Sequence, residues 1–381
     1  MTDFAATASP RIWPLSRLGR PLEAVRQFTP NWFAATMGTG ILAICLAQFP
    51  MRSRALTGIA EGLWFFNIGL FSLFCCLYAA RWVFFFDGAR RIFDHSAMSM
   101  FFGCIPMGLA TIVNGFLSFG LARWGHVAVD IAQALWWIDA ALSLACGVLV
   151  PFFMFTRQTH AVEHMTAIWL LPVVPAEVAA VSAGLLAPHL ADPQQQLFTL
   201  MSGYALWAFS VPIAMSVLVI LILRMAVHKL PHNSMAASSW LALGPIGTGA
   251  LGLLVLGGAA PAVFEGAGLG SYGPAAQGVG LVGGVLMWGY GLWWIAIACL
   301  ITLRYLREGV PFNLGWWGYT FPLGVYTVAT LRLSTLLPIP TLTYLGGALV
   351  LTLGAIWLIV GARTVAGAWT GALFVSPCLR D

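Results

Sequence analysis

Long apolar runs separated by short polar segments make up most of this chain. Ten of them approach or exceed the roughly 20 apolar helical residues that a hydrocarbon core requires. They span residues 30–50, 61–85, 97–121, 127–155, 165–187, 197–223, 238–258, 277–303, 313–334 and 341–362. Backbone polar groups inside a bilayer must bond within their own segment, so we expect helices rather than sheet. The pattern predicts an all-α polytopic membrane protein with ten transmembrane helices.

The composition excludes most soluble classes of protein. The chain is 60% hydrophobic and only 8% charged, and its mean hydropathy is +0.87. Soluble domains are about 25% charged. The formal net charge of +5 is scattered between apolar runs, which argues against a nucleic-acid partner. The seven cysteines are odd in number and mostly lie inside the runs, so they form no disulfide framework.

The distribution of Lys and Arg predicts the orientation of the chain. With the N-terminus in the cytoplasm, most of the eighteen basic residues fall on the cytoplasmic side, and the exceptions are Arg52, Arg54, Arg123 and Arg332. Cytoplasmic loops carry such an excess. We therefore expect a cytoplasmic segment at 1–29, a transmembrane domain at 30–363 and a cytoplasmic tail at 364–381, in the cell inner (plasma) membrane. The Gly/Pro-rich stretch 257–278 is expected to be non-helical and to fold over the outer mouth.

Breaks recur near the middle of the odd-numbered runs. The prolines concerned are Pro106, Pro172, Pro175, Pro245 and Pro322; the first run instead carries Gly38-Thr39-Gly40, which the seventh repeats as Gly247-Thr248-Gly249. The even-numbered runs are expected to lack a central proline. A proline inside a helix removes a hydrogen bond and bends the helix, and in lipid such a break must face protein or a water-filled cavity. The pattern predicts five helical hairpins around a central pore, although Pro and Gly are also ordinary in membrane helices.

Three motifs resemble a known transporter family. They are residues 28–33 (FTPNWF) running on to 37–41 (MGTGI), residues 169–175 (WLLPVVP), and residues 313–324 (NLGWWGYTFPLG). Together they resemble the tellurite-resistance/dicarboxylate transporter family, which includes malate permeases, sulfite efflux pumps and slow-type anion channels. The resemblance covers nearly the whole chain. It implies a quasi-fivefold pore in each protomer, a homotrimer and the transport of small anions.

Phe321 is the residue that the resemblance implies as the pore gate. It immediately precedes Pro322. A bulky ring at a helix break inside a pore would close the pore sterically and by dewetting. The alternative is an ordinary packing role for one of twenty-five phenylalanines.

The two Gly-Thr-Gly triplets and Arg332 are candidates for anion binding. If the helix unwinds at a triplet, free N–H groups and the positive end of the next half-helix suit an anion; the alternative is close packing of small residues. Arg332 is expected near the outer end of the ninth run, where it could concentrate anions. Its alternative is to extend along the helix to the outer interface.

Asp139 and Glu177 are the carboxyl groups expected deepest in the membrane. A buried carboxyl could carry a proton together with the anion. The alternative is a structural hydrogen bond or an ion pair between helices, for example with Arg332.

The expected substrate is a small anion, with a C4-dicarboxylate such as malate first, sulfite second and a tellurite-like oxyanion third. Malate should need two donor clusters, whereas compact sulfite could use one. A remote alternative is a membrane-embedded metal hydrolase, because His160, Glu163 and His164 match the H-x-x-E-H spacing of some zinc proteases. Other enzyme signatures are absent from the sequence, so we expect neither catalysis, nor a cofactor, nor a bound metal.

Overall fold

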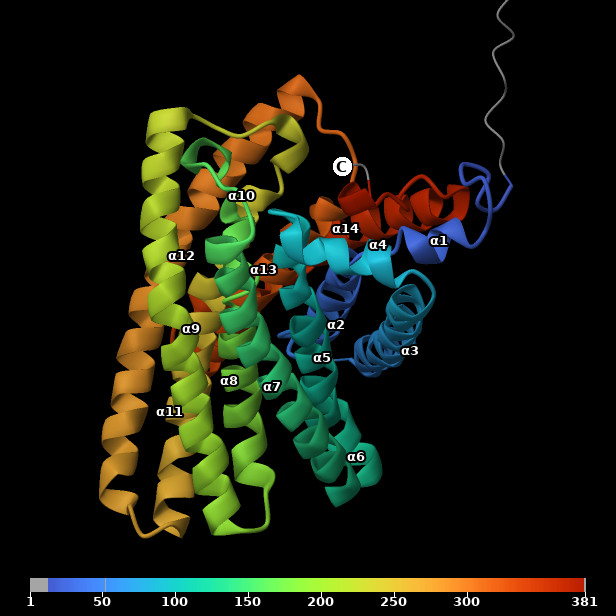
Figure 1. Cartoon of the computed structure of the whole chain (residues 1–381). Coiled ribbons are helices and arrows are strands. Elements are labelled where there is room, and N and C mark those ends of the chain that lie inside the picture. The colour runs from blue at the N-terminus through green and yellow to red at the C-terminus, as the bar shows by residue number, and fades with distance from the viewer. Residues whose placement is uncertain (1–12, 52, 380–381) are drawn as a thin grey trace, which may run out of the picture.

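The structure is a computed structural model that describes residues 13–51 and 53–379, and every regular element within them is helical (Figure 1). The α-helices are α1 (Glu23–Arg26), α2 (Ala34–Ala47), α3 (Arg54–Phe84), α4 (Phe86–Arg90), α5 (Cys104–Gly115), α6 (Leu121–Trp124), α7 (His126–Thr156), α8 (Pro175–Leu186), α9 (Pro193–His228), α10 (Ser238–Leu241), α11 (Leu243–Gly266), α12 (Gly273–Glu308), α13 (Phe321–Leu336) and α14 (Pro340–Thr370). The cationic residues Arg11, Arg52 and Arg380, which enter the predicted topology, lie outside the described residues.

Within the described residues, eight helices are long and apolar enough to cross a bilayer. The fifth and ninth runs fall short because only part of each is α-helical. In the fifth run, a turn at residues 171–174 precedes α8, which has 12 residues. In the ninth, a 3₁₀ segment precedes α13, which has 16 residues. The chain is thus an all-helical polytopic membrane protein, and its count of ten crossings stays a prediction.

Burial divides the long helices into an inner and an outer set. The most apolar windows of the spans that contain α2, α5 and α11 are 83%, 78% and 78% buried, against 17% to 33% for the other five spans. Of the 12 residues of α8, 11 are also buried, and of the 16 residues of α13, 12 are buried. The inner set is therefore α2, α5, α8, α11 and α13. The outer set, α3, α7, α9, α12 and α14, presents the apolar surface that a bilayer would cover.

The five prolines expected to bend the inner helices lie at or just before helix starts rather than in mid-helix, which corrects the expectation. Pro106, Pro175, Pro245 and Pro322 each lie within the first three residues of α5, α8, α11 or α13, and Pro172 lies in the turn before α8. The first four N–H groups of a helix have no partner inside it, so a proline there removes no hydrogen bond. A 3₁₀ or turn segment leads into α2, α5, α8 and α13, whereas α11 follows the short helix α10 after one turn residue.

Two segments are more helical than the sequence suggests. The sixth run does contain a central proline, contrary to expectation, yet α9 continues through Pro212. Most of the stretch 257–278 belongs to α11 and α12, so it does not fold over a mouth. Its glycines let these two helices touch, since a Cβ on Gly257 would lie 2.9 Å from the Cα of Gly280. Small residues permit such close approach between membrane helices.

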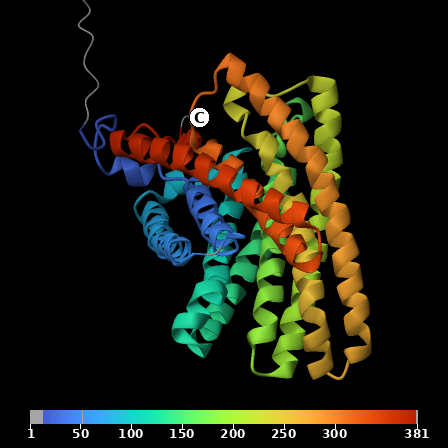
Figure 2. The ribbon, with the colours of Figure 1, turned by 180° about the vertical axis from the view of Figure 1, so that it is seen from behind.

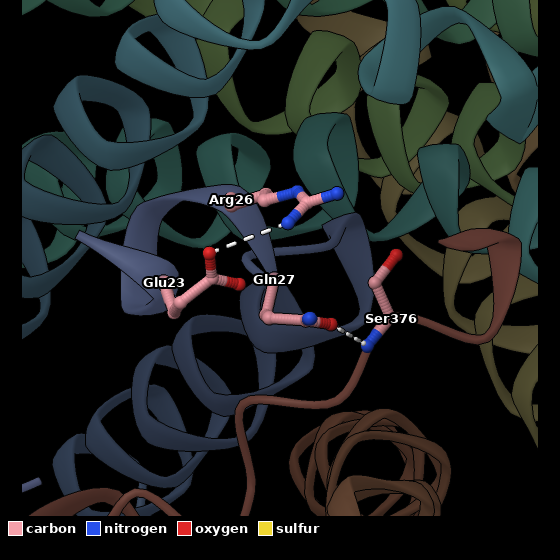
Figure 3. Close-up of polar contacts among 4 residues, drawn as sticks. All are labelled: Glu23, Arg26, Gln27 and Ser376. Carbon is pink, nitrogen blue, oxygen red and sulfur yellow. Dashed lines mark hydrogen bonds and ion pairs between the residues drawn. The ribbon is translucent and has the colours of Figure 1, made fainter. Parts of the chain in front are cut away.

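The two ends of the described chain lie side by side at one end of the helix bundle (Figures 1 and 2). The backbone N–H of Ser376 donates to Oε1 of Gln27 at 2.7 Å, next to the Arg26–Glu23 ion pair (Figure 3). Buried Arg81 of α3 joins both segments, because its guanidinium donates to the carbonyl of Phe28 at 2.5 Å and to Oγ of Ser376 at 3.2 Å.

Candidate functional site

A cavity of about 740 Å³ lies between the inner helices, from Phe321 toward their C-terminal ends. We call it the C-side cavity. Its lining repeats at matching spacings on the five helices: Ile41, Ile44 and Gln48 at the end of α2; Thr111, Asn114 and Ser118 on and just after α5; Val178, Val181 and Leu185 on α8; Thr248, Leu251 and Val255 on α11; and Phe321, Val325, Val328 and Arg332 on α13. Residues three, four and seven apart share one face of a helix. The five inner helices therefore each present one such stripe to the same cavity.

The lining of the C-side cavity is polar on one side and apolar on the other. The stripe that begins on α5 is wholly polar, and Thr248 adds a hydroxyl from α11, whereas α8 contributes only Val and Leu. Among the described residues that line it, Arg332 is the one charged side chain. A fixed positive charge without a lining carboxylate favours anions over cations.

Phe321 separates the C-side cavity from a second one. That second cavity, of about 450 Å³, lies at the N-terminal ends of the inner helices and is bordered by Asn31, Asn313 and Leu373; we call it the N-side cavity. Of the described residues, Phe321 alone lines both cavities. It is the first residue of α13, and its side chain is only 3% exposed.

The Gly-Thr-Gly triplets are regular helix, so the expected unwinding does not occur. Both α2 and α11 continue through them, which keeps their N–H groups in helical hydrogen bonds. The glycines serve close packing instead: a Cβ on Gly38 would lie 2.6 Å from the Trp317 ring, and one on Gly247 would lie 2.8 Å from the backbone nitrogen of Tyr326. Gly40 and Gly249 are equally crowded.

The two threonines of these triplets differ. Thr39 donates its hydroxyl to the carbonyl of Ala35 at 2.8 Å and accepts from Nε1 of Trp357 at 3.0 Å, so it packs between helices. Thr248 lines the C-side cavity. Of the six triplet residues, Thr248 is thus the one that reaches the site.

Asp139 and Glu177 are fully buried but lie outside the linings of both cavities. Within the described chain, none of their four carboxyl oxygens has a hydrogen-bond partner, and neither residue pairs with Arg332. The suggested ion pair with Arg332 is therefore wrong, and the structure does not connect these carboxyls to the cavities.

The H-x-x-E-H segment does not form a zinc site of the expected kind. Residues 162–164 form a short 3₁₀ turn, so His160 and His164 are not on one face of an α-helix. Partial burial lowers the pKa of His160, and its Nε2 lies 2.9 Å from Oε1 of Gln158. Across residues 13–51 and 53–379, no group of three or more His, Cys, Asp and Glu is placed to hold a metal ion.

Sequence reasoning missed the polar stripe of Thr111, Asn114 and Ser118. Its signal was available, because three polar residues three and four apart interrupt the apolar run 97–121. The helix also changes there into a π-helical turn, Phe116–Gly120, directly after Asn114 and Gly115. Such turns frequently occur at functional sites.

Among the described residues, the inner helices enclose a cavity whose lining includes one arginine and no carboxylate, and Phe321 lies between this cavity and a second one. Such a lining, in a bundle of apolar helices, suits a transmembrane protein that acts on anions. The sequence profile of the SLAC1 family, described as voltage-dependent anion channels, matches residues 27–365. The chain belongs to this family of anion transporters, which confirms the resemblance seen in the three motifs.

The curated relatives cover nearly the same length. The sulfite efflux pump of Trichophyton rubrum is 39% identical over 355 residues, which are 92% of this chain and 93% of the relative. An uncharacterized transporter of Methanocaldococcus jannaschii is 28% identical, over 93% of this chain and 97% of its own length. The malic acid transport protein of Schizosaccharomyces pombe is 25% identical, over 83% and 72%. These relatives are transporters rather than enzymes by their names.

Proposed function

We propose that this chain conducts a compact oxyanion, sulfite in the first place, across the plasma membrane through the C-side cavity. The observation that carries the proposal is the lining of that cavity, in which Arg332 is the one charge among the described residues. The similarity to sulfite efflux pumps over more than nine-tenths of the chain supports the choice of anion.

Malate becomes the second candidate substrate. It ranks first on sequence grounds, but its two donor clusters would have to come from the predicted anion-binding candidates, the Gly-Thr-Gly triplets and Arg332. Both triplets are regular helix, so those donors are engaged. The malic acid transport protein is also more distant, at 25% identity against 39%. The similarity to this malic acid transport protein is the specific observation that favours malate.

We assign the closure of the pore to the ring of Phe321, which stands between the two cavities. Phe321→Ala should raise basal sulfite flux at least about tenfold, because hydrophobic constrictions close pores by excluding water. The measurement is sulfite flux in proteoliposomes that contain the purified full chain. Phe71→Ala is the matched control, since Phe71 packs on Phe33 outside both linings.

Two outcomes contradict different parts of this proposal. If the folded Phe321→Ala protein has the same flux as wild type, the assignment of Phe321 as the gate is wrong, but the proposed transport function is not affected. If the wild-type protein transports neither sulfite nor malate under any gradient, the proposed transport function is wrong.

The proposed architecture has ten crossings, both termini in the cytoplasm, a transmembrane domain at 30–363 and a homotrimeric assembly. Its support is the family membership and the common position of the two chain ends. Light scattering of the detergent-solubilised protein, corrected for bound detergent, should give three times the chain mass of 40.9 kDa. A measured mass equal to that of one chain would contradict the proposed homotrimer.

We leave proton coupling out of the proposal because Asp139 and Glu177 lie outside both cavity linings. Asp139→Asn and Glu177→Gln should therefore leave the response of sulfite flux to an imposed pH gradient unchanged. A gradient effect that disappears in either variant would restore the coupling role.

A further inference from the structure

We propose that Thr248 and Asn114 form a binding site for a compact oxyanion in the C-side cavity, on the C-terminal side of the Phe321 ring. This inference rests on the proposed function, because it assigns the place where the conducted anion pauses. Both side chains line the cavity, and they are 1% and 7% exposed. The carrying observation is that each has a polar atom without a hydrogen-bond partner within the described chain.

Thr248 differs from the other buried threonines of the inner helices. A helical threonine normally donates its hydroxyl to a carbonyl three or four residues earlier. Those that do so here are Thr36, Thr39, Thr111, Thr327 and Thr330. The Oγ1 of Thr248 has no such partner among the described residues. A buried hydroxyl left unpaired is destabilising, so an unpaired one facing a cavity points to a ligand.

Asn114 stands on the opposite side of the α8 stripe from Thr248. Its Oδ1 lacks a partner in the described part of the chain. One turn earlier, the hydroxyl of Thr111 is engaged twice: it donates to the carbonyl of Gly108 at 2.7 Å and accepts from Nδ2 of Asn67 at 3.1 Å. Thr111 therefore holds α5 in place, and Asn114 is left free to meet a ligand. Which end of the amide faces the anion is set by rotation of the group.

The surroundings of the two side chains define the kind of ligand. Val178 and Val181 also line the cavity, from α8, the helix that packs against both α5 and α11, and Val328 lines it from α13. In this apolar setting a hydrogen bond is stronger than in water. The hydroxyl of Thr248 and the amide N–H of Asn114 can donate to two oxygens of one small anion. The guanidinium of Arg332 lies beside Gly258, since a Cβ there would be 3.2 Å from its Nη2. Gly258 is ten residues beyond Thr248 along α11, a rise of about 15 Å, so a compact anion held by Thr248 does not span to Arg332.

The test measures flux as a function of sulfite concentration in proteoliposomes that contain the full-length protein. Thr248→Val and Asn114→Leu keep the shape of each side chain and remove its donor. Each should raise the KM for sulfite about tenfold, the ratio that corresponds to about 1.4 kcal/mol for one hydrogen bond. Thr248→Ser keeps the hydroxyl and should return the KM to within about twofold of wild type.

Thr327→Val is the matched control. The hydroxyl of Thr327 donates to the carbonyl of Leu323 at 2.7 Å, and the residue lies outside the cavity linings. Its KM should equal that of wild type. A wild-type KM in folded Thr248→Val and Asn114→Leu overturns the site, and so does an equal rise in Thr327→Val. Absence of sulfite flux in the wild type instead overturns the proposed function, so the two failures are distinguishable.

Discussion

At the residue scale, Arg332 is expected to gather anions at the mouth of the C-side cavity. Arg332→Gln should lower sulfite flux about three- to tenfold at low ionic strength, because a positive charge in a cleft raises the local anion concentration. The deficit should shrink at high salt, since the Debye length falls from about 30 Å at 0.01 M to about 3 Å at 1 M. The measurement is initial flux at matched sulfite concentration across a salt series.

Arg123→Gln supplies the control for that series. It removes the same charge near the C-terminal ends of the inner helices, where Arg123 pairs with Glu61 outside the cavity linings. Its flux should match wild type at every salt concentration. Equal losses in both variants, or a loss in Arg332→Gln that ignores salt, would mean that Arg332 does not act on the anion by charge.

Single residues were predictable from the sequence where their chemistry is unusual for a membrane helix. Arg332 stands out as a charge in an apolar run, and the structure places it in the cavity lining. The triplets show the opposite case, because glycine suits both an unwound backbone and close packing. Only the contacts of Gly38 and Gly247 with neighbouring helices distinguish the two uses. The role of the polar stripe at Thr111 and Asn114 could not be predicted, because the sequence does not show which face of α5 lines the cavity.

At the element scale, contact between α11 and α12 should depend on glycine at their crossing. Gly280→Ala should lower the melting temperature of the purified protein, because the added Cβ would meet the Cα of Gly257 at 2.9 Å and the helices would have to separate. Overpacking of this kind destabilises by about 1–3 kcal/mol. Thermal unfolding in detergent, followed by circular dichroism, measures the effect.

Gly278→Ala is the matched substitution on the same helix. Apart from the adjacent residues and the neighbouring backbone of α12 itself, no described atom lies within 4 Å of a Cβ placed there, and the residue is exposed. It should be neutral or slightly stabilising, because alanine favours helix by about 1 kcal/mol over glycine. A destabilisation as large as that of Gly280→Ala would show that helix contact is not what the position requires.

The positions of the helices were more predictable than their breaks. Apolar length alone locates the eight long helices, because a bilayer permits little else. The role of the prolines is ambiguous in the sequence, because the sequence does not say where a helix begins. Pro322 in the first turn of α13 has the same residue pattern as a proline in mid-helix. The stretch 257–278 is equally ambiguous, because Gly and Pro break helices in water but are tolerated where helices pack closely in lipid.

At the scale of the whole molecule, the C-terminal tail forms part of the wall of the N-side cavity. Ala372, Leu373, Val375 and Pro377 line it together with the starts of the inner helices. The sequence predicts a ring of five helices from its repeat, but it does not predict this wall. The tail is held by contacts such as the one between Gln27 and Ser376, which are 349 residues apart (Figure 3). A local sequence pattern does not predict a contact between residues so far apart in the chain.

The buried guanidinium of Arg81 should keep that tail in place. Besides Phe28 and Ser376, it donates to the carbonyl of Gly88 at 3.5 Å. Arg81→Met removes these hydrogen bonds, each worth about 1.5–3 kcal/mol when the donor is charged, although the loss of a buried charge offsets part of the cost. Hydrogen exchange across residues 372–379 should therefore accelerate at least about tenfold, while exchange in α11 and α12 stays unchanged.

Arg90→Met is the control, because Arg90 is exposed and pairs with Asp87 alone among the described residues. Exchange of the tail in this variant should match the wild type. If Arg81→Met speeds exchange everywhere, the arginine stabilises the whole bundle rather than the tail. If it speeds exchange only in residues 372–379, the N-side cavity has a wall that loosens independently of the helices and of the Phe321 ring.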